Sequence, residues 1–590
     1  MADFERVPSF ICDDKFEEVI KDMTRRGWRR HATTGMLSSD CELIWRNLAS
    51  THFQSVFGRH VNHFRGSQHL SNKAFLTYHL RATGRAHFLP ATWSASFQTM
   101  TELVAMLVQG SLVALLAASF TGCSLSSSGS ESGAISESMW SELENLEEVV
   151  NALDMEGNTD TSEAGQQCRE LCRCLVTLVR GLSQCPCVGM DAGPAAHDAA
   201  SSDLWSYLDL IVAKHGTAAI SATLRHLRDI APGLLSDSNS VGERNLWIVK
   251  PVGGSCGDSI QVVAGVRAAL LTVRSMGLKC VVQKYIERPL LVREGRKFDI
   301  RQWLLVTDVN PLTVYGYRDY YLRLSACALD LSDAQLSNPA MHLCNHAVQK
   351  KQTEVNAQAS VQAGPKVLDL DDTDYSCDTM MSRTEFVAWL EGVYGPHEGA
   401  SVLARLESDI RELSVGAVQS AVDRLCRVGK GFEWLGLDFM VVNPTGHARD
   451  LSVKLIEVNV SPDVSLSTPV TAALVPTATR ALLDIVLNTP MAEADGADCA
   501  PVSPWQMWHA GAKKAEGFQE ILTRRKEGCM AFGEGYGPRQ LHVLERVEAL
   551  LELNVQESFR EGGVEARGVG ESEGEGEGET DNGGSSDDEI

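Results

Sequence analysis

The chain has 590 residues, 44% of them hydrophobic, and a formal net charge of −24 at pH 7. A chain of this length holds several domains, and its hydrophobic fraction is that of a globular protein with a substantial core. The acidic balance argues against a general nucleic-acid binder, because such binding depends mainly on neutralising phosphates. The charge is uneven, since residues 557–590 hold twelve Asp or Glu against two Arg and carry −10 of the total.

The N-terminus predicts neither secretion nor a membrane anchor. Its first six residues, Met-Ala-Asp-Phe-Glu-Arg, are charged in part and lead into no apolar signal region. In a long chain of this kind the sixteen cysteines are expected to be reduced thiols in the cytoplasm. One apolar stretch, residues 103–120, is at the short end for a membrane span and has no flanking Lys or Arg. We therefore favour a buried helix there over a transmembrane one and expect no membrane partner.

Residues 1–95 predict a small N-terminal α/β domain. Residues 16–24 carry apolar side chains at helical spacing, and a second helix is expected over residues 74–81. The basic run at residues 25–30 is typical of a solvated helix end, and a patch for an acidic partner is the other interpretation. Residues 121–203 are rich in Ser, Gly and acidic residues, and we expect residues 96–203 to form a partly disordered insertion.

A glycine-rich loop follows a buried strand at residues 246–249. The strand ends in Lys250, and the loop contains Ser255 and Gly257. Backbone N–H groups of such a loop can close around a phosphate, because glycine has no Cβ in the way. The loop is not a Walker A motif, since no Gly-Lys-Ser/Thr follows. A glycine-rich hairpin turn would explain the same residues, and both interpretations stay open.

Three charges alternate along the next strand, predicted at residues 297–307. Lys297, Asp299 and Arg301 share one face, because successive side chains of a strand point to opposite sides. The strand continues into residues 303–306, which are apolar on both faces. This pattern predicts a central strand whose charges line a cleft rather than face solvent.

Two further strands are predicted on either side of this one in the chain. Residues 280–287 form a buried strand, and residues 313–324 form a single strand that brings Tyr317, Tyr321 and Arg323 to one face.

Helices follow in the C-terminal half. A capping box at residues 382–385 predicts the start of one helix, and longer helices are expected over residues 401–426 and 471–488. Beyond them we expect a helical extension at residues 491–556 and a disordered acidic tail at residues 557–590.

Two strands predict a magnesium site. Glu457 and Asn459 project from the same face of one strand, and Asp438 comes from the strand before it. Oxygen donors of this kind suit Mg²⁺, which is usually held by one or two carboxylates plus phosphate oxygens. One carboxylate on a strand would be weak support, whereas two strands that supply three oxygen ligands make a site hypothesis.

Several short runs resemble the tubulin–tyrosine ligase-like family, in the family's order and at compatible spacing. These runs are Trp247–Pro251, Val281–Glu287, Lys297–Trp303, His342–Asn345 and Ile456–Asn459. Residues 306–313, 321–323 and 342–350 look most like the tubulin monoglycylases. The resemblance is dense from about residue 241 to 485 and reaches thinly into the N-terminal domain.

This resemblance implies an ATP-grasp fold of the α+β class. Nucleotide would lie between two α+β subdomains, a central one at residues 204–295 and a C-terminal one at residues 296–490. Lys250 would reach the phosphates, and Asp438, Glu457 and Asn459 would hold Mg²⁺. The hinge that binds adenine would consist of Gln283, Lys284, Tyr285 and Ile286. The remaining implied nucleotide contacts are Lys73, Ser255, Gly257, Lys297, Asp299, His342, Cys344 and Asn345.

The resemblance also implies an ATP-dependent ligase. ATP would activate a glutamate γ-carboxylate of a tubulin tail as an acyl phosphate, and the amine of free glycine would then form an isopeptide bond. Preplaced cations and Mg²⁺ stabilise the charge that develops on a transferring phosphoryl group. Arg301 and Arg323 are the candidates to steady the carboxylate and the acyl phosphate, with Glu457 as the third catalytic residue.

By the same resemblance we expect a monomer that acts on tubulin in the cytoplasm, the cytoskeleton and the axoneme of cilia or flagella. A tubulin polyglutamylase, a small-molecule ligase of the same fold and a non-catalytic microtubule- or axoneme-binding protein remain as alternatives. Asp258 favours the non-catalytic alternative, because it places a negative charge where the family usually carries cations. The Glu/Gly alternation of residues 571–579 resembles a tubulin tail and is otherwise a solubilising segment.

Overall fold

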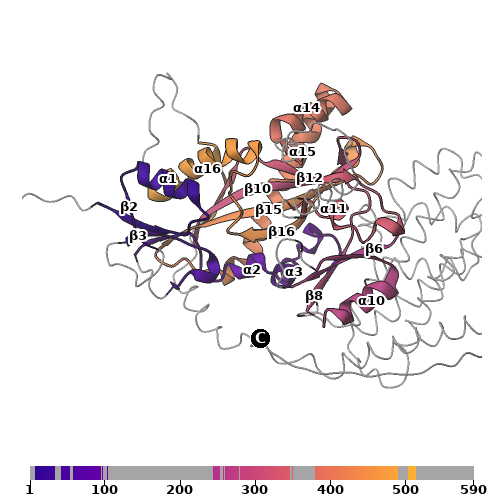
Figure 1. Ribbon diagram of the computed structural model, residues 1–590, viewed down its shortest axis with the longest axis horizontal. Helices are drawn as coiled ribbons and strands as arrows, with labels where there is room; N and C mark the ends of the chain where they lie inside the picture. The colour runs from indigo at the N-terminus through magenta and orange to yellow at the C-terminus, as the bar shows by residue number, and fades with distance from the viewer. Residues whose placement is uncertain are drawn as a thin grey trace, which may run out of the picture.

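The computed structural model describes residues 7–32, 41–53, 58–94, 244–252, 259–277, 279–345, 379–488 and 503–512, with residues 96, 103, 106, 257, 348 and 349. These residues form a mixed α/β protein with three β-sheets (Figure 1). Almost all of the predicted insertion, most of the predicted helical extension and the acidic tail lie outside the described residues.

The first sheet consists of five parallel strands in the order β14-β4-β3-β1-β2. Its strands are β1 (Ser9–Cys12), β2 (Arg29–Arg30), β3 (Cys41–Trp45), β4 (His60–Val61) and β14 (Lys430–Gly431). Helix α1 (Glu17–Arg25) connects β1 to β2, so the helix predicted at residues 16–24 is confirmed. Because β14 comes from the C-terminal part of the chain, the N-terminal sheet is not built from N-terminal residues alone.

The second sheet consists of four antiparallel strands in the order β5-β8-β6-β7. Its strands are β5 (Thr92–Ser94), β6 (Leu246–Pro251), β7 (Gln261–Ala264) and β8 (Cys280–Lys284), and α10 (Gly265–Ser275) follows β7. Strands β6 and β7 form a hairpin around the glycine-rich loop, as the hairpin-turn interpretation expects. Strand β5 pairs with β8, although the sequence places it at the end of the N-terminal domain.

The third and largest sheet has eight strands and is organised around β10 (Arg296–Val309), which pairs with β9, β11, β12 and β15. The prediction of a central strand is therefore confirmed. The other strands are β9 (Leu291–Val292), β11 (Leu312–Tyr317), β12 (Tyr321–Ala328), β13 (Met380–Ser382), β15 (Glu433–Val442), β16 (Ser452–Val460) and β17 (Trp505–Ala510). All of its strand pairs are antiparallel.

The helices cover these sheets in two groups (Figure 1). Helices α14 and α15 lie over one face of the large sheet, while α1 and α16 pack together near the N-terminal sheet. The α-helices whose bounds have not yet been given are α2 (Gln68–Ser71), α3 (Lys73–Ala82), α11 (Pro339–His342), α14 (Arg383–Tyr394), α15 (Pro396–Ala421) and α16 (Pro469–Leu487). Helix α14 begins with the predicted capping box, in which Ser382 and Glu385 bond reciprocally.

The side chains of β10 alternate between two faces, and each face contributes to a different hydrophobic core. Phe298 and Ile300 lie on the face that joins the large core beneath α14 and α15. On the other face, Trp303 and Leu305 join a second core with residues of α1, α16 and the N-terminal sheet. The charged residues that precede Trp303 share this second face, where no apolar core covers them. The cavity described below begins there.

Two predictions need correction. The strand predicted at residues 313–324 is interrupted, because Leu304 pairs with Gly316 while Arg301 pairs with Tyr321. The three residue steps from Arg301 to Leu304 on β10 therefore face five steps, from Gly316 to Tyr321, on the neighbouring segment. The two extra residues form a bulge around Arg318. An excess of two preserves the alternation, so the predicted common face survives the break.

The predicted helical extension is wrong for residues 505–510, which form the edge strand β17 beside β11. Trp505 is buried against Trp434 and Tyr317, and its indole N–H donates to the Ala478 carbonyl at 3.0 Å. Packing at the sheet edge therefore decides the conformation of this short segment, whose own sequence shows little periodicity.

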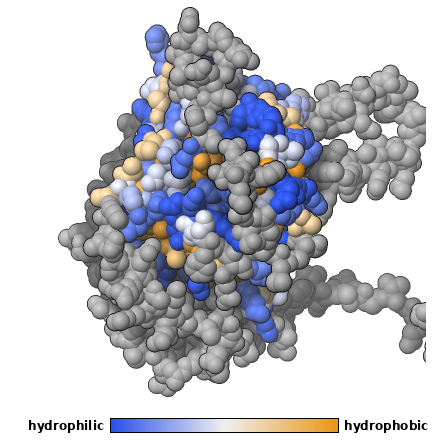
Figure 2. Space-filling model, turned by 90° about the vertical axis from the view of Figure 1, so that its left-hand side faces the viewer, coloured by the Kyte–Doolittle hydropathy of each residue, from blue (hydrophilic) through white to orange (hydrophobic). Residues whose placement is uncertain are grey.

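Helix α16 is the one described helix whose length and hydropathy would also fit a membrane span. Its Val475, Leu482 and Leu483 are fully buried in the second core, as in the core helix of a globular domain. On the side of the molecule that carries α1, hydrophilic residues predominate on the described surface (Figure 2).

A buried hydrogen bond between a histidine and a carboxylate ties the N-terminal sheet to the large sheet. The His63 ring lies 2.6 Å from the Glu433 carboxylate through Nδ1, and both side chains are almost fully buried. The same carboxylate accepts hydrogen bonds from the Phe64 N–H at 3.0 Å and from the Ser67 hydroxyl. A carboxylate at the first residue of β15 is thus stabilised by three groups from the N-terminal part of the chain.

Substituting His63→Ala is expected to lower the free energy of unfolding by about 1–3 kcal/mol, because it removes a hydrogen-bond partner from the buried Glu433 carboxylate. Urea unfolding of the purified chain measures this difference. As a control, Lys21→Ala removes an exposed cation paired with Glu17 and Glu18, and this variant is expected to lose much less stability. Equal losses in the two variants would contradict the role given to this pair.

Candidate functional site

A cavity of about 810 Å³ lies where the three sheets meet. This size is within the range of pockets that hold cofactors and small molecules. Apart from Ser255, which lies outside the described residues, every predicted site residue lines it. These residues are Lys73, Lys250, Gly257, Gln283, Lys284, Tyr285, Ile286, Lys297, Asp299, Arg301, Arg323, His342, Cys344, Asn345, Asp438, Glu457 and Asn459. The structure thus brings together side chains from six strands of two sheets and from helices α3 and α11.

A row of alternating charges crosses the floor of the cavity. Arg323 on β12 lies opposite Asp299 on β10 and donates a hydrogen bond to each of its carboxylate oxygens, at 2.6 and 2.9 Å. Arg301, also on β10, lies opposite Asp438 on β15 and donates to both of its oxygens, at 2.5 and 3.1 Å. Arg323 also reaches Asp438, at 2.8 Å. Four charged side chains therefore neutralise one another in the interior.

The two guanidinium groups control the ionisation of Asp438. Burial alone would disfavour its charged form, but Arg301 and Arg323 outweigh burial and hold the pKa of Asp438 well below its usual range. Asp438 is therefore ionised at neutral pH and available as an oxygen ligand.

Glu457 and Asn459 extend the row onto β16. Glu457 lies directly opposite Asp438, and the Asn459 amide donates to both carboxylates, at 3.2 and 3.3 Å. Lys73, the first residue of α3, places its ammonium 3.7 Å from the other oxygen of Glu457. This spacing leaves Glu457 the most open of the three predicted metal ligands.

The donor set fits a magnesium ion that is shared with phosphate. Two adjacent carboxylates and an amide oxygen are ligands that Mg²⁺ accepts when a phosphorylated ligand completes the shell. The Asn459 amide would present its oxygen after turning over, since its N–H₂ faces the carboxylates here. Among the described residues, no group of three or more His, Cys, Asp or Glu side chains is placed to hold a metal without such help.

A hydrogen-bonded chain fixes three polar groups at the opposite wall. The Lys297 ammonium donates to the Tyr285 hydroxyl and to the His342 carbonyl, both at 2.9 Å. The Tyr285 hydroxyl in turn lies 2.9 Å from His342 Nδ1. Burial and the Lys297 charge lower the pKa of His342 to about 4, so its ring is neutral. Nδ1 of the neutral ring accepts a hydrogen bond from the Tyr285 hydroxyl. Lys297 is therefore held with its charge toward the cavity.

Strands β6 and β8 contribute a second buried lysine. Lys250 donates to the Gln283 side-chain oxygen at 2.8 Å, and the Gln283 amide donates to Thr92 on β5 at 3.0 Å. Burial lowers the pKa of Lys250 to about 8, which Glu457 opposes. Lys284, in contrast, turns its ammonium away to Glu287 at 2.6 Å. Only the backbone of Lys284 is thus placed to meet a ligand.

The end of the cavity near β6 is apolar. Ile248, Ile260, Tyr285, Leu343 and Met440 line it. Gly257 packs there so closely that an added Cβ would lie 3.0 Å from the side chains of Leu343 and Val348. Cys344 is buried with its thiol against the Lys297 carbonyl, and Asn345 follows it on the wall. A flat apolar ligand such as a nucleobase suits this end.

Sequence reasoning missed several residues of the site. Gly436 on β15 lies beside Arg301, and a Cβ there would meet the Pro462 Cβ at 2.9 Å and the Arg301 Cδ at 3.2 Å. Lys15 and Asp463 line the far end of the cavity. Nothing local marks these residues, because their roles arise from contacts between distant segments.

Comparisons with known proteins place this region in a family. Residues 222–495 match the model of the tubulin-tyrosine ligase family. A tubulin monoglycylase of Mus musculus is 36% identical over 257 residues, which cover 42% of this chain and 24% of the relative. A protein monoglycylase of the same species is 31% identical over 299 residues (48% and 33%), and tubulin glycylase 3C of Tetrahymena thermophila is 34% identical over 249 residues (42% and 21%). The matches thus span a fifth to a third of the length of these relatives.

Substituting Gly436→Ala is expected to destabilise the protein by about 1–3 kcal/mol, because the new methyl group displaces Pro462 or Arg301. Chemical unfolding measures the loss. Gly392→Ala is the matched control, since nothing lies within 4 Å of a Cβ added at this position inside α14. That variant is expected to gain about 0.4–1 kcal/mol from helix propensity. A loss in Gly392→Ala as large as in Gly436→Ala would refute the steric account.

Burial of Lys250 predicts a pH-dependent cost to stability. Below about pH 8 both folded and unfolded states hold its proton, whereas between about pH 8 and the ordinary value of 10.5 only the unfolded state does. Stability relative to a Lys250→Met variant should therefore rise with pH through this window, by at most ~1.4 kcal/mol per pH unit. Urea unfolding of both proteins from pH 7 to 10.5 tests this. Parallel curves would show that Lys250 titrates normally.

Proposed function

Given that the chain contains a tubulin-tyrosine ligase family domain, we propose that it is an ATP-dependent ligase that joins glycine to glutamate side chains in the acidic C-terminal tails of tubulin. One observation carries the proposal most. A single cavity combines an apolar end, buried lysines and arginines, and the oxygen donors Asp438, Glu457 and Asn459. Phosphoryl transfer needs such a set, because its catalysis is mainly positioning and charge stabilisation.

ATP would lie between the second sheet and the large sheet, as in an ATP-grasp fold with subdomains at residues 204–295 and 296–490. The adenine would occupy the apolar end beside the hinge that follows β8, where Tyr285 and Ile286 line the wall. Lys297 and Asp299 would contact the ribose and phosphates, together with His342, Cys344 and Asn345. Lys73 and Lys250 would meet the phosphates, near which Ser255 and Gly257 of the hairpin loop are also expected.

Asp438, Glu457 and Asn459 would hold Mg²⁺, which supplies charge neutralisation between neighbouring phosphate oxygens when bound. Lys250 complements it from the second sheet. Because the pKa of Lys250 is about 8, a nearby ligand can change how much of it is protonated. An anionic phosphate beside it would favour the protonated form.

The reaction that we propose has two steps. An oxygen of the acceptor glutamate attacks the terminal phosphorus of ATP, the bond to the bridging oxygen breaks, and ADP leaves. The amine of glycine then attacks the acyl carbon, loses a proton to solvent, and releases phosphate to leave an isopeptide bond. Arg301 and Arg323 carry the cations next to this chemistry, and each is aimed by its carboxylate partner. We therefore assign them to steady the acceptor carboxylate and the transferring phosphoryl group.

Acidic tubulin tails as substrates would place the protein on the cytoskeleton, including the axonemes of cilia and flagella. The assignment to glycine rests on the names of the relatives, which are tubulin or protein monoglycylases and glycylases.

Incubating the purified chain with microtubules, Mg·ATP and each of glycine, glutamate and tyrosine tests the proposal directly. Mass spectrometry is expected to find glycine alone on glutamates of the tubulin tails. Glu457→Gln should lower the rate by about 10²–10³, because it removes a ligand and a negative charge from the phosphate site. An exposed substitution outside the cavity, Glu391→Gln, is the control and should leave the rate unchanged.

The other outcomes are distinct. Transfer of glutamate in place of glycine would make the protein a polyglutamylase of the same fold. Failure to bind ATP in calorimetry would refute every ligase assignment and favour a non-catalytic tubulin-binding role.

A further inference from the structure

The cavity continues past the charge row to a second end that the proposed nucleotide leaves vacant. Its wall there consists of Lys15, Asn47, Ser461, Pro462 and Asp463, with residues 48–50 beside them. Lys15 and Asn47 come from the loops that follow β1 and β3, whereas the other three come from the loop between β16 and α16. The second end is thus built by three loops, two from the N-terminal part of the chain and one from its C-terminal part.

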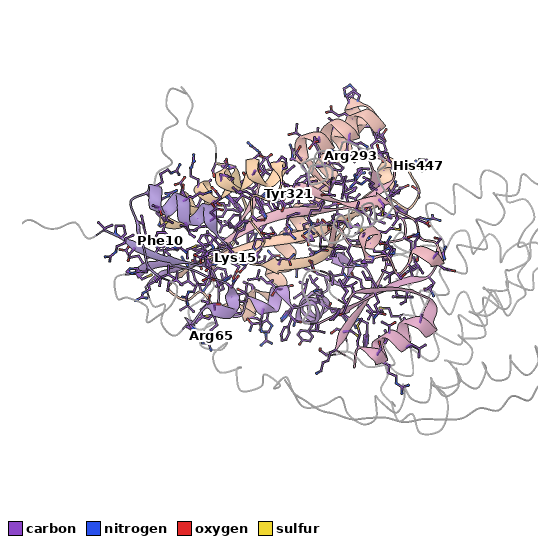
Figure 3. The ribbon with its side chains drawn as sticks, in the orientation of Figure 1. Phe10, Lys15, Arg65, Arg293, Tyr321 and His447 are labelled. Carbon is purple, nitrogen blue, oxygen red and sulfur yellow. The ribbon has the colours of Figure 1, made fainter. Side chains whose placement is uncertain are left out.

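Two exposed and opposite charges stand at this end. Lys15 lies just before α1, at the place where the N-terminal sheet meets β10 and β15 (Figure 3). Its ammonium sits 4.5 Å from the centre of the Phe16 ring. Partial burial lowers the pKa of Lys15, and the Asp463 and Asp13 carboxylates raise it, so the field of Asp463 reaches Lys15. Both side chains are exposed on the wall of the cavity, where they can meet a ligand.

The loop that carries Asp463 is held in place. Ser461 adopts a φ of 57°, a left-handed conformation that is uncommon outside glycine. Its hydroxyl lies 3.1 Å from His63 Nε2, on the ring that pairs with Glu433. Pro462 is buried beside Gly436, and one Asp463 oxygen accepts the Ser465 N–H at 3.0 Å. Asp463 is therefore fixed with one carboxylate oxygen turned elsewhere.

The charge pattern decides between two occupants. The acidic tail of an acceptor protein would be attracted by Lys15 and repelled by Asp463. A free amino acid is a zwitterion, with a carboxylate for Lys15 and an ammonium for Asp463, and so gains from both charges. A ligand in this position would also approach Arg301 on the floor, which Pro462 and Gly436 flank.

We propose that Lys15 and Asp463 form the subsite that binds the free amino-acid substrate, with its carboxylate toward Lys15 and its ammonium toward Asp463. This assignment rests on the proposed ligase function and specifies where its second substrate binds. The small side chains of Ala49 and Ser50 in the same wall belong to this subsite.

Steady-state kinetics of Lys15→Ala and Asp463→Asn test the subsite. Each variant is expected to raise the KM for glycine about tenfold or more, since each removes a hydrogen bond to a charged group. The KM values for ATP and tubulin should stay within about twofold. The charge-swapped double variant, Lys15→Asp with Asp463→Lys, should recover part of the loss, because the two residues act as a pair. Asp14→Asn, an exposed carboxylate of the same loop outside the cavity, is the control.

Direct calorimetry with glycine, in the presence of a non-hydrolysable ATP analogue, separates this inference from the proposed function. The wild-type chain should bind glycine, and Asp463→Asn should lose that binding while it retains the analogue. Binding of glycine by both proteins would overturn the subsite and leave the ligase function standing, as would a rise in the KM for tubulin alone. Glycine bound by neither protein would overturn the subsite as well. Wild-type protein that binds glycine and never transfers it would count against the ligase function only.

Discussion

The position of Asp438 between Arg301 and Arg323 is the interaction on which the rest of the site depends. All three side chains are buried, and a buried charge is tolerated only when its partners are close and well aligned. Because the three residues lie on three different strands, their pairing fixes the register of β12, β10 and β15. A shift of one residue would turn every charge of the row into the apolar core beneath α14 and α15. The same row then presents Glu457 and Asn459 beside Asp438, so the placement of the three predicted metal ligands follows from the ion pairs.

Local periodicity explains how much of this could be predicted from the sequence. The alternation of Lys297, Asp299 and Arg301 identified a central strand and its charged face, and the capping box at Ser382 located α14. The central position of β10 could be predicted because its apolar half is apolar on both faces, as in a strand of a protein interior. The break near Arg318 escaped notice because the two extra residues keep the alternation in phase.

What the sequence did not reveal depends on contacts between distant segments. Gly436 has no unusual φ and no turn around it, so its importance appears only once Pro462 and Arg301 are seen against it. Strand β17 has little strand signal of its own and takes its conformation from the edge of β11. Lys15 and Asp463 are exposed charges that resemble ordinary surface residues until the cavity between them is known. Such residues cannot be predicted from the pattern of neighbouring positions in the sequence.

The N-terminal residues are part of the site rather than an appendage to it. Lys73 approaches Glu457, β5 completes the edge of the sheet that carries Lys250, and the carboxylate of Glu433 is stabilised by groups from the N-terminal part. The family match covers residues 222–495 alone and therefore omits all three contributions. A chain reduced to that span would remove the hydrogen-bond partners of Glu433 from the N-terminal part and would open the cavity on the side of Lys15. The cavity therefore depends on more of the chain than residues 222–495, and it needs every segment that contributes a charge to the row or holds one in place.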